Sequence, residues 1–182
     1  MPADQSTIEV PLTRGLVTLI DESDADLVLP FRWHATRNGN TFYVHRRGQV
    51  IKCERAVVSL HRWLLGLTDG HVHVDHANRN GLDNRRSNLR VCSHAQNQAN
   101  RAKQRTHAGR PTSSIHKGVS WDVDARRWRA HIQINGVLKH IGRFRTEIEA
   151  AIKYDKAATA LFGEFALLNF PIEPALNQGD KR

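Results

Sequence analysis

Cysteine and long apolar runs are scarce in this sequence, and each shortage excludes a class of protein. The 182 residues contain two cysteines, Cys53 and Cys92, which form no Cys-x-x-Cys pair. No structural zinc is therefore expected, and two isolated thiols are typical of reduced, buried cysteines. No apolar run approaches the roughly 20 residues of a membrane-spanning helix. The first residues lack the basic and apolar segments of a secretory signal, so we expect an intracellular protein that is not secreted.

Acidic residues are also scarce beyond the first thirty positions. The chain holds 27 basic and 18 acidic residues, for a net charge of +9 and a pI of about 10.2. Residues 1–30 contain one basic and six acidic residues, which leaves 26 against 12, a net +14, for the remainder. This charge favours a polyanionic partner. Because no lysine-rich amphipathic helix is present, we expect nucleic acid and not a membrane surface.

The first hundred residues predict short strands and helices. Residues 9–20 read as a hairpin, and 21–24 begin a helical turn that ends at Pro30. Residues 31–34 and 41–44 predict two strands about an Asn-Gly turn. Residues 55–65 place apolar side chains on one helical face before Gly66, which predicts an amphipathic helix.

A polar, basic stretch then separates two parts of the chain. Residues 101–114 have almost no apolar side chain and include Gly and Pro, as interdomain linkers do; a solvated loop within one domain is the alternative. We predict a first domain over 1–102, a linker over 103–114, a second domain over 115–172 and a tail over 173–182.

The second domain has a compact pattern. Residues 118–121, 127–134 and 137–142 predict three antiparallel strands, and Asn135-Gly136 makes the last turn. A capping box at 146–149 begins a helix that runs to Gly163. Alternate residues of the second strand are apolar, so this helix is expected to cover that face and leave the other one basic. The fold class is therefore α+β, with a three-stranded antiparallel sheet packed on one helix.

One constellation in the first domain carries hydrolytic chemistry. Asp75 and His76 end a short strand, Asn88 follows a polar loop, and Asn97 lies on the next helix. Phosphodiester hydrolysis needs an activated water and neutralised charge on the phosphate. His76 can deprotonate the water, while Asp75 and the Asn97 amide oxygen suit a hard cation such as Mg²⁺. Asn88 is placed to bond across the loop and fix the imidazole.

Neighbouring residues have less certain assignments. Arg85, Arg86 and Arg90 can grip phosphates flanking the cut. The competing interpretation of the whole loop is a catalytically inactive structure held together by asparagine hydrogen bonds. For His61, a packing or hydrogen-bonding role is favoured over a functional one.

The pattern Asp75-His76, eleven residues, Asn88, eight residues, Asn97 resembles the HNH (ββα-metal) endonucleases. The run from Gly81 to Arg90 and the upstream Leu-His-Arg are similar to phage and intron homing endonucleases of mobile elements. The resemblance covers most of 9–102. It implies that His76 is the general base, that Asp75 and Asn97 bind Mg²⁺, with Mn²⁺ as the alternative, and that Asn88 is the central asparagine. His94 and Asn100, one turn either side of Asn97, leave the helix ligand open.

The second domain also resembles a known family. The sequences Lys-Gly-Val-Ser-Trp, Trp-Arg-Ala-His-Ile and Leu-Asn-Phe-Pro, within 113–171, are similar to the plant Apetala/ethylene-response-factor DNA-binding domain. That family docks its sheet in the DNA major groove. The resemblance implies that the DNA-facing residues are Lys117, Ser120, Arg129, His131, Gln133, His140 and Arg143. Several of these depart from the plant pattern, so the target sequence does not transfer.

Together the two halves predict a metal-dependent DNA endonuclease that acts on double-stranded DNA and is directed by a sheet-type reader. No dimer face is evident, so we expect a monomer or a weak dimer, and one active site per chain favours nicking. The alternative is a non-catalytic, sequence-specific DNA-binding regulator with a degenerate nuclease fold. An RNA-binding protein is less favoured, because no exposed aromatic pair suited to base stacking is evident.

Overall fold

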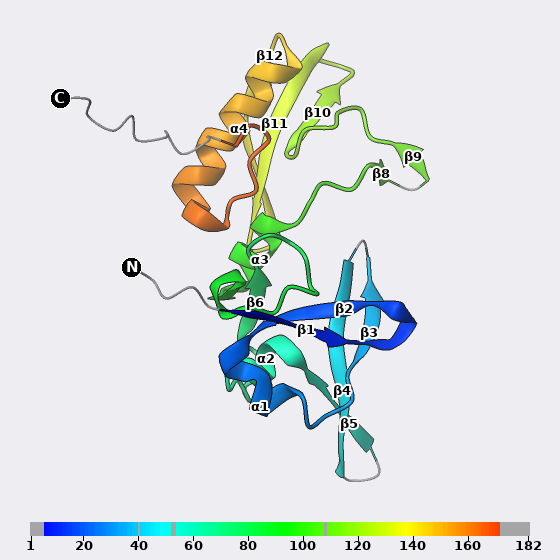
Figure 1. Cartoon of the computed structure of the whole chain (residues 1–182). Coiled ribbons are helices and arrows are strands. Elements are labelled where there is room, and N and C mark those ends of the chain that lie inside the picture. The colour runs from blue at the N-terminus through cyan, green and yellow to red at the C-terminus, as the bar shows by residue number, and fades with distance from the viewer. Residues whose placement is uncertain (1–5, 40, 52–53, 108, 172–182) are drawn as a thin grey trace, which may run out of the picture. The chain divides into compact units, whose positions relative to one another are not determined.

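A computed structural model describes residues 6–39, 41–51, 54–107 and 109–171. The fold is α+β, with several small antiparallel sheets and few helices, and it divides into two compact units, Met1–Asn100 and Arg101–Arg182 (Figure 1). Within the described ranges, no helix is long and apolar enough to cross a membrane.

The first unit consists of three small antiparallel sheets and short helices. The expected hairpin is confirmed, and a three-stranded sheet β3-β4-β5 and a strand pair β6-β7 follow it. The elements are β1 (Thr7–Pro11), η1 (Thr13–Gly15), β2 (Val17–Asp21), η2 (Glu22–Asp24), α1 (Ala25–Val28), β3 (His34–Asn38), β4 (Thr41–Ile51), β5 (Glu54–Ser59), α2 (Leu60–Leu64), β6 (His73–His76), η3 (Arg86–Asn88), β7 (Leu89–Cys92) and α3 (His94–Asn100).

One apolar core holds this unit together. It joins side chains from the N-terminal hairpin, the central sheet, α2 and β7. Val74 of β6 packs against it, so the strand that ends in Asp75-His76 is attached to the core on one side. The buried members are Val10, Ile20, Val28, Trp33, Val44, Leu60, Leu64 and Leu89.

The helix predicted over 55–65 is wrong in its first half. Residues Glu54–Ser59 form β5, which pairs with β4, and only Leu60–Leu64 are helical. Val57 and Val58 are β-branched and satisfy a strand as well as the helical period. Val57 is 69% exposed, as expected on the outer face of a sheet and not on a buried helix face. The strand expected over 31–34 begins only at His34.

The second unit contains the predicted sheet and helix. The strands β10 (Val119–Asp122), β11 (Arg127–Ile134) and β12 (Val137–Phe144) are antiparallel in that order, and α4 (Glu147–Phe162) lies along one face (Figure 1). The capping box is confirmed: the Thr146 hydroxyl accepts from the Glu149 amide and Glu149 accepts from the Thr146 amide, both at 3.2 Å. A turn η4 (Gly163–Phe165) ends the helix. Val119, Ala130, Ala150 and Ala151 form the core.

The polar stretch 103–114 differs from a plain linker. It contains a small hairpin, β8 (Thr106–His107) and β9 (Arg110–Pro111). The Lys103 ammonium donates to carbonyls of the second unit, and Ser114 is buried, donating to Glu147 at 2.6 Å. Both ends of the stretch are therefore built into the second unit.

Cys92 is a free, buried thiol, as predicted. Burial raises its pKa to about 11, which makes it unreactive at neutral pH. Cys53 lies outside the described residues.

Candidate active site

The predicted catalytic residues lie on a strand pair followed by a helix. Strand β6 ends in Asp75 and His76, a polar loop leads through η3 into β7, and α3 follows directly. Across the ladder Asp75 pairs with Arg90 and His76 with Leu89. Asp75 is 6% exposed and His76 is 4% exposed, so both need polar partners inside the unit.

The Asp75 carboxylate has two such partners. Arg90 donates to Oδ2 at 2.5 Å, and the Asn100 amide nitrogen donates to Oδ1 and Oδ2 at 2.9 and 3.0 Å. The same Asn100 nitrogen donates to the His76 carbonyl at 2.9 Å. Asn100 therefore ties α3 to the end of β6, and the acceptors around it fix which end of its amide faces the site.

The His76 imidazole is held by Asn84. The Asn84 amide nitrogen donates to the Thr18 hydroxyl at 2.9 Å and to the Gly81 carbonyl, so its oxygen is turned toward His76. That oxygen lies 3.3 Å from Nε2 of His76. Because an amide oxygen only accepts, Nε2 carries the proton and Nδ1 is left as the acceptor. The tautomer is thus set by residues of the first unit's own core.

Two aromatic rings enclose His76. The ring of His61 lies 5.3 Å away and that of Tyr43 5.7 Å away, both edge-on. Burial lowers the pKa of His76 below its ordinary 6.5, and the Asn84 hydrogen bond and the carboxylates of Asp75 and Asp83 oppose this only in part. His76 is therefore neutral near pH 7, the state a proton acceptor requires.

The burial of His61 beside His76 can be tested through the pH dependence of the free energy of unfolding. Burial, and then the neighbouring His76, lower its pKa to about 3, so it stays neutral in the fold while the unfolded chain takes a proton below pH 6.5. Stability contributed by neutral His61 is complete above pH 6.5 and is lost as pH falls toward 3, by about 1.4 kcal/mol per pH unit. From pH 7 to pH 5, the free energy of unfolding measured in urea should fall by about 2 kcal/mol more for the wild type than for His61→Phe. An equal loss in both proteins would show that His61 is not buried in this way.

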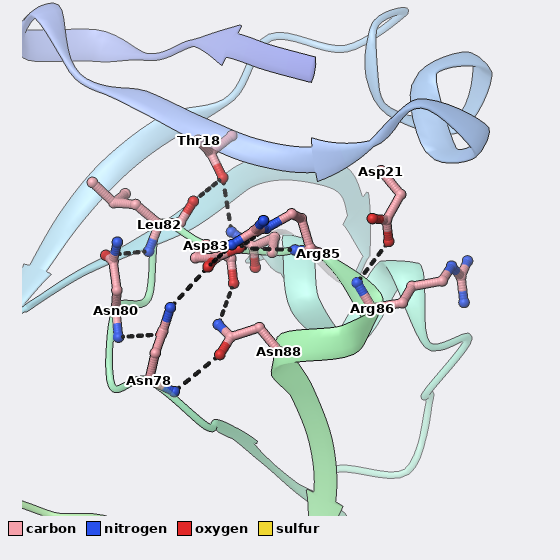
Figure 2. A network of polar contacts seen from close by, with 10 residues as sticks. Thr18, Asp21, Asn78, Asn80, Leu82, Asp83, Arg85, Arg86 and Asn88 are labelled. Carbon is pink, nitrogen blue, oxygen red and sulfur yellow. Dashed lines mark hydrogen bonds and ion pairs between the residues drawn. The ribbon is translucent and has the colours of Figure 1, made fainter. Parts of the chain in front are cut away.

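Hydrogen bonds within the loop fix its path from β6 to β7 (Figure 2). The Asn88 amide donates to the Asp83 carbonyl at 2.7 Å and accepts from the Asn78 backbone at 2.9 Å. Asn78 donates to the Asp83 carboxylate at 2.8 Å. Asn88 therefore bonds across the loop, as predicted. The contact to the imidazole that was expected of Asn88 is made by Asn84, because both ends of the Asn88 amide already bond within the loop.

The acidic N-terminal segment holds the other side of the loop. Asp21 accepts from the Arg86 backbone at 2.8 Å (Figure 2). Asp24 forms an ion pair with the Arg86 guanidinium at 2.7 Å. Leu19 of β2 exchanges backbone hydrogen bonds with Leu82 and Asn84. Residues 17–24 are thus part of the site's support, a role that the sequence left open.

The three arginines predicted to grip phosphate all have carboxylate partners. Arg85 pairs with Asp83 at 2.7 Å, Arg86 with Asp24, and Arg90 with Asp75. Arg85 and Arg86 keep 37% and 43% of their side chains exposed, against 16% for Arg90. Their DNA-binding role stays a prediction.

The chemistry of the donors fits a hard cation only in part. Asp75 supplies carboxylate oxygens, and Asn97 lies one helical turn before Asn100 with no side-chain hydrogen bond among the described residues. In the same described ranges, no group of three or more His, Cys, Asp or Glu could hold a metal ion. A cation here would depend on Asp75, an amide oxygen and water, the ligand set that Mg²⁺ prefers.

Of the predicted DNA-facing residues, Arg129, His131, Gln133, His140 and Arg143 lie on β11 and β12, on the face opposite Ala130, which packs against α4. Lys117 precedes β10 and lies outside the strands. Arg129 pairs across the ladder with Arg143, and His131 with His140. Ser120 Oγ, Arg129 Nε and His131 Nδ1 are buried and have no hydrogen-bond partner among the described residues. Arg143 pairs with Asp122 at 2.9 Å, Gln133 donates to the Gly136 carbonyl, and Lys117 donates to the Arg101 carbonyl.

Sequence reasoning missed the residues that position His76. Asn84 and Thr18 carry no signal of their own, because their contact joins positions 66 residues apart. The sequence around Tyr43 indicates only a strand. For His61 the signal was the Leu-His-Arg sequence of the resemblance, and the structure places it against the catalytic candidate.

Comparisons with known proteins agree with this arrangement. A sequence profile of HNH endonucleases matches residues 61–99, which cover most of α2, then β6, the loop and β7, and most of α3. An uncharacterized HNH endonuclease of Acanthamoeba polyphaga mimivirus is 32% identical over 161 residues, which cover 86% of this chain and 76% of the relative. No solved structure matches the chain. By this relationship, the chain belongs to the HNH endonuclease family.

Proposed function

We propose that this protein is a metal-dependent endonuclease that hydrolyses phosphodiester bonds of double-stranded DNA, with β6, β7 and α3 as its ββα-metal arrangement. The observation that carries the proposal is the state of His76. It is buried and neutral, its Nε2 proton is fixed by Asn84, and it follows the carboxylate of Asp75 directly.

In this function His76 accepts a proton from the attacking water through Nδ1, and Asn84 holds the ring while the charge develops. Asp75 and Asn97 would hold the divalent cation, Mg²⁺ or Mn²⁺. When bound, the cation supplies charge neutralisation at the phosphate and at the leaving oxygen. Asn88 keeps the loop, and with it Asn84, in place.

We further propose that the second unit directs the cut. Residues 101–145 carry eleven basic residues against two acidic ones. The sheet face opposite α4 holds three buried polar atoms that have no hydrogen-bond partner in the part of the chain that the structure describes. Both features suit phosphate and base-edge contacts. The resemblance to the Apetala/ethylene-response-factor domain points to the same face. A tethered reader raises the local concentration of its target at the nuclease.

Selection of cleaved sites from a random duplex library tests the function. The full chain with Mg²⁺ should enrich one recurring sequence among the cut molecules. Cutting without enrichment would refute the directing role of the second unit and leave the nuclease.

A DNA-binding regulator with an inactive nuclease fold is the second candidate. One observation favours it, the ion pair that occupies Asp75. Enrichment of bound but uncut sites, with every divalent cation supplied, would support it against the proposed enzyme.

A further inference from the structure

Arg90 occupies the carboxylate that the proposed function assigns to the metal. Its guanidinium lies 2.5 Å from Oδ2 of Asp75, and the two residues face each other across the β6–β7 ladder. Only 16% of the Arg90 side chain and 7% of the Asp75 side chain are exposed. The pair is therefore held by the strand register and is not a loose surface contact.

A divalent cation and this guanidinium cannot share Asp75 without strong repulsion. Both oxygens of the carboxylate already accept hydrogen bonds, from Arg90 and from Asn100. Like charges a few ångströms apart in a largely buried site repel strongly. Binding of the cation must then release Arg90, and a guanidinium released inside the unit needs another anion.

The phosphate of the substrate is the anion available at such a site. A guanidinium pairs with phosphate through two parallel N–H donors, as it does with carboxylate. We propose that Arg90 is a resident counter-ion of Asp75 that the metal displaces and the DNA phosphate then receives. This inference rests on the proposed function, because it assumes that the metal binds Asp75.

Two consequences follow from this exchange. The free protein binds divalent cations weakly, because Arg90 competes for Asp75. Metal and DNA strengthen each other's binding by the same factor, since coupling between two sites is reciprocal. Couplings of this kind are typically about 5- to 150-fold.

Mn²⁺ binding to the full-length chain, followed by electron paramagnetic resonance without DNA, tests the competition. Arg90→Gln should bind Mn²⁺ about tenfold more tightly than the wild type. Arg90→Lys keeps the charge and should stay close to the wild type. Arg37→Gln, which removes an exposed guanidinium from the same unit at a position with no assigned role in the site, is the charge control and should not tighten binding.

The coupling is tested separately, in case Arg90→Gln does not fold. In a His76→Gln background, which slows cutting, addition of a duplex should tighten Mn²⁺ binding about tenfold in the protein that retains Arg90. Absence of that effect, or Mn²⁺ affinity of folded Arg90→Gln at or below the wild-type value, overturns the inference.

Asp75→Asn distinguishes failure of the proposed metal site from failure of the proposed role of Arg90. If this variant binds Mn²⁺ as well as the wild type, the metal site of the proposed function fails. If it loses Mn²⁺ while Arg90→Gln leaves the affinity unchanged, the metal site stands and only the inference fails.

Discussion

Replacing His76 by glutamine is expected to lower the single-turnover rate of DNA cleavage by about 10²–10⁴-fold, the usual contribution of a general base. Glutamine preserves the size and polarity of the side chain but offers no nitrogen that accepts a proton. Since His76 is not assigned to the metal or to DNA, binding of both should change little. The rate is measured under saturating enzyme and Mg²⁺ on a duplex recovered from the library.

His71→Gln is the matched control for this variant. His71 lies two residues before β6 and is exposed. Its backbone amide donates to the Asp69 carboxylate. It should cleave at the wild-type rate. A His76→Gln protein that folds and still cleaves within a few-fold of the wild type would remove His76 from the mechanism.

Replacing Gly118 by alanine is expected to destabilise the second unit by about 2–5 kcal/mol, from a left-handed backbone and an overpacked contact together. Gly118 has φ +72°, and an added Cβ would lie 2.0 Å from the ring of Tyr154 and 2.7 Å from the His131 carbonyl. Tyr154 is 4% exposed and has no room to withdraw. The melting temperature of this unit should fall by about 10 °C or more.

Gly136→Ala separates the two causes. Gly136 has φ +82°, but nothing lies within 4 Å of an added Cβ. It should cost only the backbone penalty of about 1–2 kcal/mol. Calorimetry of the full chain measures both variants. Equal destabilisation by the two substitutions would show that the close approach of Tyr154 to Gly118 adds nothing to the backbone penalty.

Local patterns predicted the second unit better than the first. The Thr146–Glu149 capping box and the Asn135-Gly136 turn are signals within a few residues, and both have the expected geometry. The segment 55–65 failed because its apolar spacing suits a strand and a helix alike. Pairing with β4, a tertiary contact, decides between them.

The site shows the same limit of local information. The Asp75-His76 pair and the residues that follow it were enough to locate the catalytic candidates at the end of a strand. They did not show which side chains hold Asp75 and His76 in place. Asn84 is held by Thr18 from β2, and Asp75 by Asn100 from α3 and Arg90 from β7. Only folding brings these elements together, so the sequence offered Asn88 as the partner of the imidazole and left the helix residue open among Asn97, His94 and Asn100. The acidic residues at 21 and 24 likewise acquire their role only through Arg86.

The central prediction is that the protein cleaves DNA only with a divalent cation held by Asp75. Its most direct test is a supercoiled plasmid carrying a selected site, incubated with the full chain and Mg²⁺, with EDTA, and with Asp75→Asn in place of the wild type. We expect nicked or linear product with the wild type and Mg²⁺, none in EDTA, and none with Asp75→Asn at any Mg²⁺ concentration. Cleavage that persists in EDTA, or that Asp75→Asn carries out at the wild-type rate, would contradict this prediction.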